Sequence, residues 1–259
     1  MLTLSLANLY SLLSHYFWPM LRILSLFITA PFFNEKEITK KTKVGLSMVL
    51  SFLVGQNLPV NNMDFFSIDG LWIGGQQLVI GSMIGLTIQL IFVVVRTAGE
   101  IIGLQMGLSF ATFYDPIGGQ NTPIVARILN LLSMLLFLAF NGHLWMLQVI
   151  SDSFIMLPVS NAPLHAMGMF SLVKLAGLIF KFGLMLGMPV ITLLLSINLT
   201  LGLLNRLIPQ LSIFVIGFPL TLTVGMGALS LMMYTLAPFF ENLMLQMFDR
   251  LSGIMMQLN

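Results

Sequence analysis

The chain has 259 residues, of which 58% are hydrophobic and 8% are charged, and its mean hydropathy is +0.99. Soluble domains carry about 25% charged residues, so a soluble fold could not cover this much apolar surface, and we expect an all-α, polytopic integral membrane protein. The formal net charge of +2 comes from scattered basic residues, which argues against nucleic acid as a partner, and the absence of cysteine excludes disulfides and thiolate metal sites.

Apolar segments follow one another along the chain. A helix that crosses the hydrocarbon layer of about 30 Å needs about 20 residues. Five segments reach that length, and a sixth, residues 44–58, is too short to cross alone. The five longer segments are residues 8–30, 71–95, 124–150, 172–199 and 211–236.

The connections between these segments differ in charge. Residues 34–43 hold four lysines, whereas residues 56–70 and 151–171 contain no lysine or arginine. The positive-inside rule therefore puts the lysine-rich connection in the cytoplasm and the start of the chain on the other side. Lys174 and Lys181 fit this topology badly, because they fall at the outer end of the segment 172–199.

Residues 96–107 predict a helix with a glycine face directly after the segment 71–95. Residues four apart lie on one face of a helix, and small residues there let another backbone approach closely. Arg96 and Glu100 have the same spacing and can form an ion pair. We interpret this stretch as a surface for tight packing against partner helices; the alternative is an ordinary helix with a surface ion pair. The glycine face consists of Gly99, Gly103, Gly107 and Ala111.

A second polar stripe precedes the last apolar segment. Helical spacing places Asn198, Gly202 and Asn205 on one face, where buried amides should be hydrogen-bonded. Arg206 follows, and Pro209-Gln210 should end the helix and start a hairpin with the last segment. Two interpretations remain open: a polar turn that caps two helices, or a contact with another subunit.

A polar loop that breaks the helical pattern lies at residues 107–122, between two apolar segments. Asp115 precedes Pro116, which disfavours helix, and Gly118-Gly119 lets the chain reverse. Non-helical backbone survives at membrane depth only when it is buried in protein or faces water. The loop is therefore either a connector outside the bilayer or the lining of a cavity.

Large apolar side chains gather beside this loop. They favour a constriction that closes by excluding water. The cluster consists of Met106, Phe110, Phe113 and Tyr114.

Other functional classes find little support. A secondary transporter for a small solute usually shows internal repeats and ionisable residues at the midplane, and Arg96 with Glu100 is the only candidate pair. No hydrolase, zincin or P-loop pattern occurs, and the three histidines lack metal-ligand spacing. We therefore expect no enzyme activity, no catalytic residue, no metal and no cofactor.

Residues 100–116 read EIIGLQMGLSFATFYDP and resemble the signature region of the FliR family. Members of that family are integral subunits of the flagellar type III export gate, and they are related to the T subunit of virulence injectisomes. Further matching stretches follow in the expected order over nearly the whole chain. They are residues 30–33, 141–143, 188–189 and 205–210, with Gly217 and Pro219 beyond.

The resemblance implies a helical assembly in the bacterial inner membrane, at the flagellar basal body, that passes unfolded export substrates. It would contain one R subunit with several copies of P- and Q-type subunits, next to B-type and A-type export proteins. Residues 1–171 would be a P-like portion and residues 172–259 a Q-like hairpin with a tail. Much of such a core stands out of the bilayer plane, which would explain the short segment 44–58. An injectisome T subunit is the alternative.

The resemblance also implies that residues 107–122 form a plug in the conduit. Phe110 and Phe113 would be the sealing side chains. The shape of the plug would come from Asp115, Pro116, Gly118 and Gly119.

Overall fold

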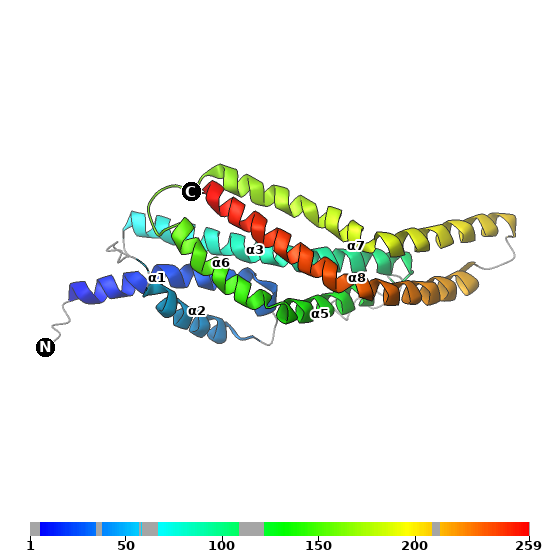
Figure 1. The fold of residues 1–259 in the computed structure, drawn as a ribbon, viewed down its shortest axis with the longest axis horizontal. Coiled ribbons are helices and arrows are strands. Elements are labelled where there is room, and N and C mark those ends of the chain that lie inside the picture. The colour runs from blue at the N-terminus through cyan, green and yellow to red at the C-terminus, as the bar shows by residue number, and fades with distance from the viewer. Residues whose placement is uncertain are drawn as a thin grey trace. The chain divides into compact units, whose positions relative to one another are not determined.

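The computed structural model describes residues 6–34, 38–56, 58, 67–108, 122–208 and 213–258. The described residues are 89% helical and contain no strand, which confirms the predicted all-α class. Figure 1 shows the arrangement of the helices. The elements are α1 (Leu6–Thr29), the short 3-10 helix η1 (Pro31–Asn34), α2 (Lys40–Gly55), α3 (Ile68–Gln105), α5 (Ile124–Ala139), α6 (Gly142–Met156), α7 (Ala166–Leu207) and α8 (Ile213–Leu258).

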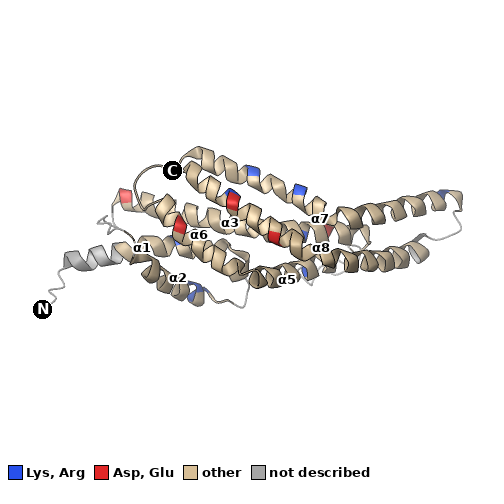
Figure 2. Ribbon diagram, viewed as in Figure 1, with Lys and Arg blue, Asp and Glu red and all other residues tan. Residues whose placement is uncertain are grey.

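Three of the described helices, α3, α7 and α8, are long and apolar enough to cross a membrane. A fourth span results if α5 and α6 count as one bent pair. The long helices exceed the expected spans: α3 has 38 residues, which at a rise of 1.5 Å per residue is about 57 Å, almost twice the hydrocarbon thickness. Charged residues are few along these helices (Figure 2).

The apolar segment predicted at residues 124–150 is divided into two helices that are bent by 67° relative to each other. The helix ends at Ala139 and a new one begins at Gly142. Between them Asn141 has a φ of 56°, in the left-handed region that asparagine tolerates better than most residues. The carbonyl oxygen of Asn141 accepts from the backbone N–H groups of Leu144 and Trp145, so the second helix starts at once.

The chain forms two compact units. The first takes Met1–Leu90, Asn141–Ala176 and Gln246–Asn259, and the second takes Ile91–Phe140 and Gly177–Leu245. Helices α3, α7 and α8 contribute residues to both. The predicted division after residue 171 concerns likeness to two subunit types, and it stays a prediction.

In the first unit, α1 and α3 touch backbone to backbone. A Cβ atom at Gly81 would meet the carbonyl oxygen of Arg22 and the hydroxyl of Ser25, and one at Gly85 would meet the hydroxyl of Thr29. Glycine at these two positions, one turn apart, therefore sets the separation of the two helices.

Helix α2 runs antiparallel to α1 in the same unit (Figure 1). The imidazole Nε2 of His15, in the first half of α1, lies 2.6 Å from the carbonyl oxygen of Gly55 at the end of α2. The start of α2 is capped by Thr39, whose hydroxyl accepts from the N–H of Thr42. The cap stabilises a helix of only 16 residues, and the His15 contact joins its end to α1.

The last turn of α8 closes the first unit against the start of α7. The N–H of His165 donates to the carbonyl oxygen of Leu258, and the hydroxyl of Ser171 donates to Gln257 at 2.6 Å. Gly168 gives the Leu258 side chain room to approach.

In the second unit, α3 is surrounded by α5, α7 and α8. The ring of Phe92 contacts Phe137 of α5 and Phe240 of α8, with centroids 5.3 Å and 6.2 Å away. On another side of α3, Gly183 of α7 lies next to the carbonyl oxygen of Val94. The core of this unit is therefore built around α3.

Candidate functional site

The predicted plug segment leaves α3 at a defined helix end. Gly107 has a φ of 80°. Its N–H donates to the carbonyl oxygen of Leu104 at 3.0 Å, and the N–H of Leu108 donates to Gly103 at 3.1 Å. This pair of bonds around a left-handed glycine is a Schellman motif, which terminates a helix and turns the chain away.

Polar side chains from two neighbouring helices lie against the carbonyl groups at this end, which have no partner within α3. The amide of Asn198, on α7, donates to the backbone oxygen of Gln105 at 3.1 Å and to its side-chain oxygen at 3.2 Å. The hydroxyl of Thr221, on α8, lies 3.4 Å from the carbonyl oxygen of Met106. The point where the segment leaves is thus fixed from two sides.

Met106 is fully buried between α3 and α8. Its thioether chain lies against Gly225, where an added Cβ would come within 2.8 Å of the Met106 Cε and Cγ atoms. Because no other residue type would leave that space, Met106 anchors the end of α3 in the core. Its predicted part in a seal stays a prediction.

The residues that follow the predicted plug segment lie next to the end of α3, where that segment begins. A Cβ at Gly103 would approach Pro123, and one at Gly99 would approach the backbone of Ala126 at 2.6 Å. Gly99 and Gly103 thus pack closely against α5 of the same chain; a contact of this face with another subunit stays a prediction. Gly107 lies off this face, because α3 ends at Gln105.

The predicted ion pair is present on α3. The Nε atom of Arg96 lies 2.8 Å from Oε1 of Glu100, and the two side chains are 49% and 35% exposed. An exposed pair at this spacing contributes only about 0.3–0.5 kcal/mol.

The polar stripe on α7 divides into two parts. Asn198 is half-buried and contacts α3, whereas Gly202, Asn205 and Arg206 are exposed. No atom approaches the position where Gly202 would carry a Cβ. The remaining predicted residues lie outside the part of the chain that the structure describes. They are Phe110, Ala111, Phe113, Tyr114, Asp115, Pro116, Gly118, Gly119, Pro209 and Gln210.

A buried arginine in the first unit was missed by the sequence analysis. Arg22 is completely buried in the middle of α1. Its Nε donates to Oε1 of Gln77 at 2.7 Å, and its two terminal nitrogens donate to the carbonyl oxygens of Ser153 and Leu157, each at 2.8 Å. The guanidinium carbon lies 4.1 Å from the centre of the Phe154 ring.

These contacts give Arg22 a clear structural role. Ser153 and Leu157 lie at the end of α6, where carbonyl groups lack helical partners and the helix dipole is negative. One arginine therefore joins α1, α3 and the end of α6. The signal in the sequence was a lone cation inside the apolar segment 8–30, since ionisable residues at such positions almost always face other protein groups.

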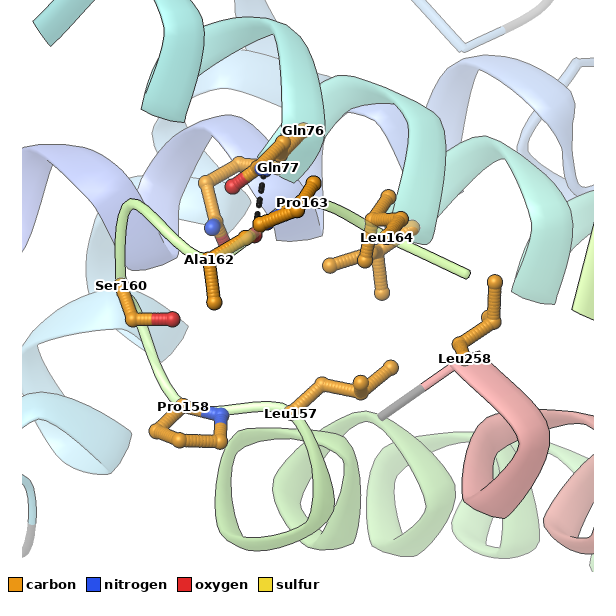
Figure 3. Close-up of a pocket in the computed structure, with 10 residues that line it drawn as sticks. Gln76, Gln77, Leu157, Pro158, Ser160, Ala162, Pro163, Leu164 and Leu258 are labelled. Atoms are coloured by element: carbon orange, nitrogen blue, oxygen red, sulfur yellow. Dashed lines mark hydrogen bonds between the residues drawn. The ribbon is translucent and has the colours of Figure 1, made fainter. Parts of the chain in front are cut away.

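The connection from α6 to α7 continues this polar cluster. The amide nitrogen of Gln76 donates to the carbonyl oxygen of Ala162 at 2.7 Å, which fixes the connection to α3. Between them lies a pocket of about 30 Å³, with Gln76 and Gln77 on one side and Leu157, Pro158 and Ser160 on the other (Figure 3). This volume suits one or two water molecules, because one water needs about 10–15 Å³.

The sequence profile of a family described as "Bacterial export proteins, family 1" matches residues 13–247. The chain belongs to this family of bacterial export proteins. The flagellar biosynthetic protein FliR of Pectobacterium carotovorum subsp. carotovorum is 51% identical over 259 residues, which cover 100% of this chain and 99% of the relative. FliR of Escherichia coli (strain K12) is 52% identical over 248 residues, or 96% of this chain and 95% of the relative.

A distant relative matches as well. FliR of Bacillus subtilis (strain 168) is 27% identical over 210 residues, which cover 79% of this chain and 80% of the relative. The predicted resemblance to the FliR family is confirmed. The chain is a membrane subunit of the flagellar export apparatus, and it works in protein export for flagellar biosynthesis.

Proposed function

We propose that the chain forms, with P- and Q-type subunits, the gated conduit through which unfolded flagellar proteins leave the cytoplasm. We also propose that residues 107–122 form the plug that closes this conduit. The assembly lies in the bacterial inner membrane at the flagellar basal body, and several copies of P and Q surround one R subunit. B-type and A-type export proteins adjoin it. The chain acts as a mechanical part without enzyme activity.

The observation that carries this proposal is how the two ends of the plug segment are held. Gly107 ends α3 in a hydrogen-bonded turn, and Pro123 starts α5 beside Gly103. Both ends of the segment are therefore held close together on helices of the second unit, as a plug anchored at one place requires. The contacts of Asn198 and Met106 support this fixed base.

The relatives' names favour the flagellar system over an injectisome. The transporter alternative gains nothing from Arg96 and Glu100, because their side chains are 49% and 35% exposed, whereas coupling residues face a protein interior or a water-filled cavity.

Shortening the plug segment tests the proposal. Residues 110–120 are replaced by a short Gly-Ser linker, which the closeness of Gly103 to Pro123 permits. We expect cells to leak small ions through the assembled gate while export of flagellar proteins continues, because the base of the segment is untouched. The readouts are ion flux across the membrane and the amount of hook and filament protein outside the cell.

The control places a linker of the same kind at residues 59–66, in another polar connection. It should leave the barrier intact. A tight membrane in the plug variant, with P and Q subunits still co-purifying, would overturn the plug assignment. Failure of the unmodified chain to co-purify with P- and Q-type subunits would overturn the proposed assembly.

A further inference from the structure

Helix α2 exposes its large apolar side chains and buries its small ones, the opposite of a helix on the surface of a water-soluble protein. The residues that face α1 are small: Ser47, Ser51 and Gly55 are buried, and the two serine hydroxyls donate to the helix's own carbonyl groups. The large apolar residues point outward. The most exposed are Met48 at 57%, Val49 at 58%, Phe52 at 53% and Leu53 at 56%.

The length of α2 limits what this outward face can contact. The helix has 16 residues, or about 24 Å, and the apolar part from Val44 onward is shorter still, so it cannot cross a hydrocarbon layer of about 30 Å. From Val44 to Gly55 no exposed side chain offers a hydrogen bond. Such a face suits acyl chains on one side of a bilayer.

The charges on α2 lie at one end. Lys40, Lys41 and Lys43 occupy its first turn, and the helix contains no acidic residue (Figure 2). This is the unfavourable end for cations, because the helix dipole is positive there. A bound anion would offset the repulsion between these three lysines and the helix end.

We propose that α2 is an interfacial helix that binds anionic phospholipid. The lysines of its first turn contact the phosphate groups, and the face formed by Met48, Val49, Phe52 and Leu53 enters the acyl region of the same leaflet. Anionic lipid accounts for both the lysines of the first turn and the exposed apolar face. A basic end beside an apolar face is typical of helices that lie at a membrane surface. Because α2 is joined to α1 through His15 and Gly55, the lipid contact fixes the depth of the first unit in the membrane.

The absence of cysteine from the chain makes a direct test possible. Val49→Cys introduces a single attachment point on the outward face, and a fluorophore is attached there. The full chain is then placed in nanodiscs of phosphatidylcholine with a fraction of phosphatidylglycerol. Phospholipids brominated on their acyl chains report contact with lipid, and iodide reports contact with water.

We expect strong quenching by brominated lipid, weak quenching by iodide, and a preference for brominated phosphatidylglycerol over brominated phosphatidylcholine. Lys40→Gln with Lys41→Gln should reduce that preference by about fivefold for each lysine, because one lysine near an anionic surface is worth about that factor in affinity. The matched control, Lys174→Gln with Lys181→Gln, removes two exposed lysines from α7 and should leave it unchanged.

Three results would overturn the proposal. Quenching by iodide alone would put the face in water. Protection from both quenchers would mean that a protein surface, such as a second copy or an acidic partner, covers it. Equal quenching by the two lipids in the parent chain, or the same loss in the α7 control, would remove the role of the α2 lysines.

Discussion

Arg22 concentrates more polar contacts than any other described side chain. A guanidinium carries five N–H donors in a planar fork. In Arg22 they reach the side-chain amide of Gln77 on α3 and two carbonyl groups at the end of α6. A buried cation held this way is costly to disturb, because the oxygens around it would stay buried without a donor. Loss of the Arg22 side chain should therefore lower the stability of the whole first unit.

Arg22→Met tests this, since methionine keeps most of the volume and removes every donor. We expect a loss of unfolding free energy on the order of 3 kcal/mol, because hydrogen bonds to a charged group contribute about 1.5–3 kcal/mol each. Thermal unfolding in detergent measures it. Arg127→Met on the exposed side of α5 is the control and should change little. Equal melting temperatures for both variants would contradict the role given to Arg22.

The left-handed backbone at Gly107 predicts the sign of a second change in stability. Its φ of 80° costs an ordinary residue about 1–2 kcal/mol, so Gly107→Ala should lower stability by about that amount. Gly227, on α8 of the same unit, has no atom near its missing Cβ; Gly227→Ala should instead raise stability by up to about 1 kcal/mol through helix propensity. Chemical unfolding of the two variants should therefore give opposite signs, and a shared sign would argue against the turn at Gly107.

At the scale of elements, the contact between α1 and α3 depends on two missing side chains. A methyl group at Gly81 would meet a backbone carbonyl, which cannot turn aside as a flexible side chain can. The helices would have to separate, and the bonds of Arg22 to Gln77 would lengthen with them. Packing and polar contacts are thus coupled along this pair.

Gly81→Ala should consequently destabilise the chain by about 1–3 kcal/mol, the usual cost of overfilling a packed interface. Gly75→Ala, two turns earlier on the same helix, has open space at its Cβ and serves as the control. Melting temperatures of the two variants in one detergent decide the matter. Should Gly81→Ala melt with the parent chain, the backbone contact would not be limiting.

The elements also show where sequence reasoning succeeds. Hydropathy located α3, α7 and α8, because apolar runs of that length have few other uses. It underestimated their lengths, since a helix continues through polar residues such as Arg96 and Glu100 while an apolar run stops at them. It also missed the break at Asn141, because a left-handed asparagine leaves no mark in the apolar pattern.

Residue partners were harder to foresee than elements. The glycine spacing on α3 indicated a close helix contact but gave no means to choose α5 of the same chain as the neighbour. Arg22 stood out as a lone cation, yet its partners lie 55, 131 and 135 residues away in the chain. Pairings over such separations depend on the tertiary fold, which local patterns do not contain.

For the whole molecule, the composition of the first unit has a consequence for synthesis. Its early helices α1 and α2 leave the ribosome long before residues 246–258, which close the same unit through Leu258 and Gln257. Until translation reaches that stretch, the start of α7 at Gly168 lacks its contact with Leu258. The protein therefore spends most of its own production incomplete, which makes the interval before chain release the time when chaperones and proteases of the membrane decide its yield.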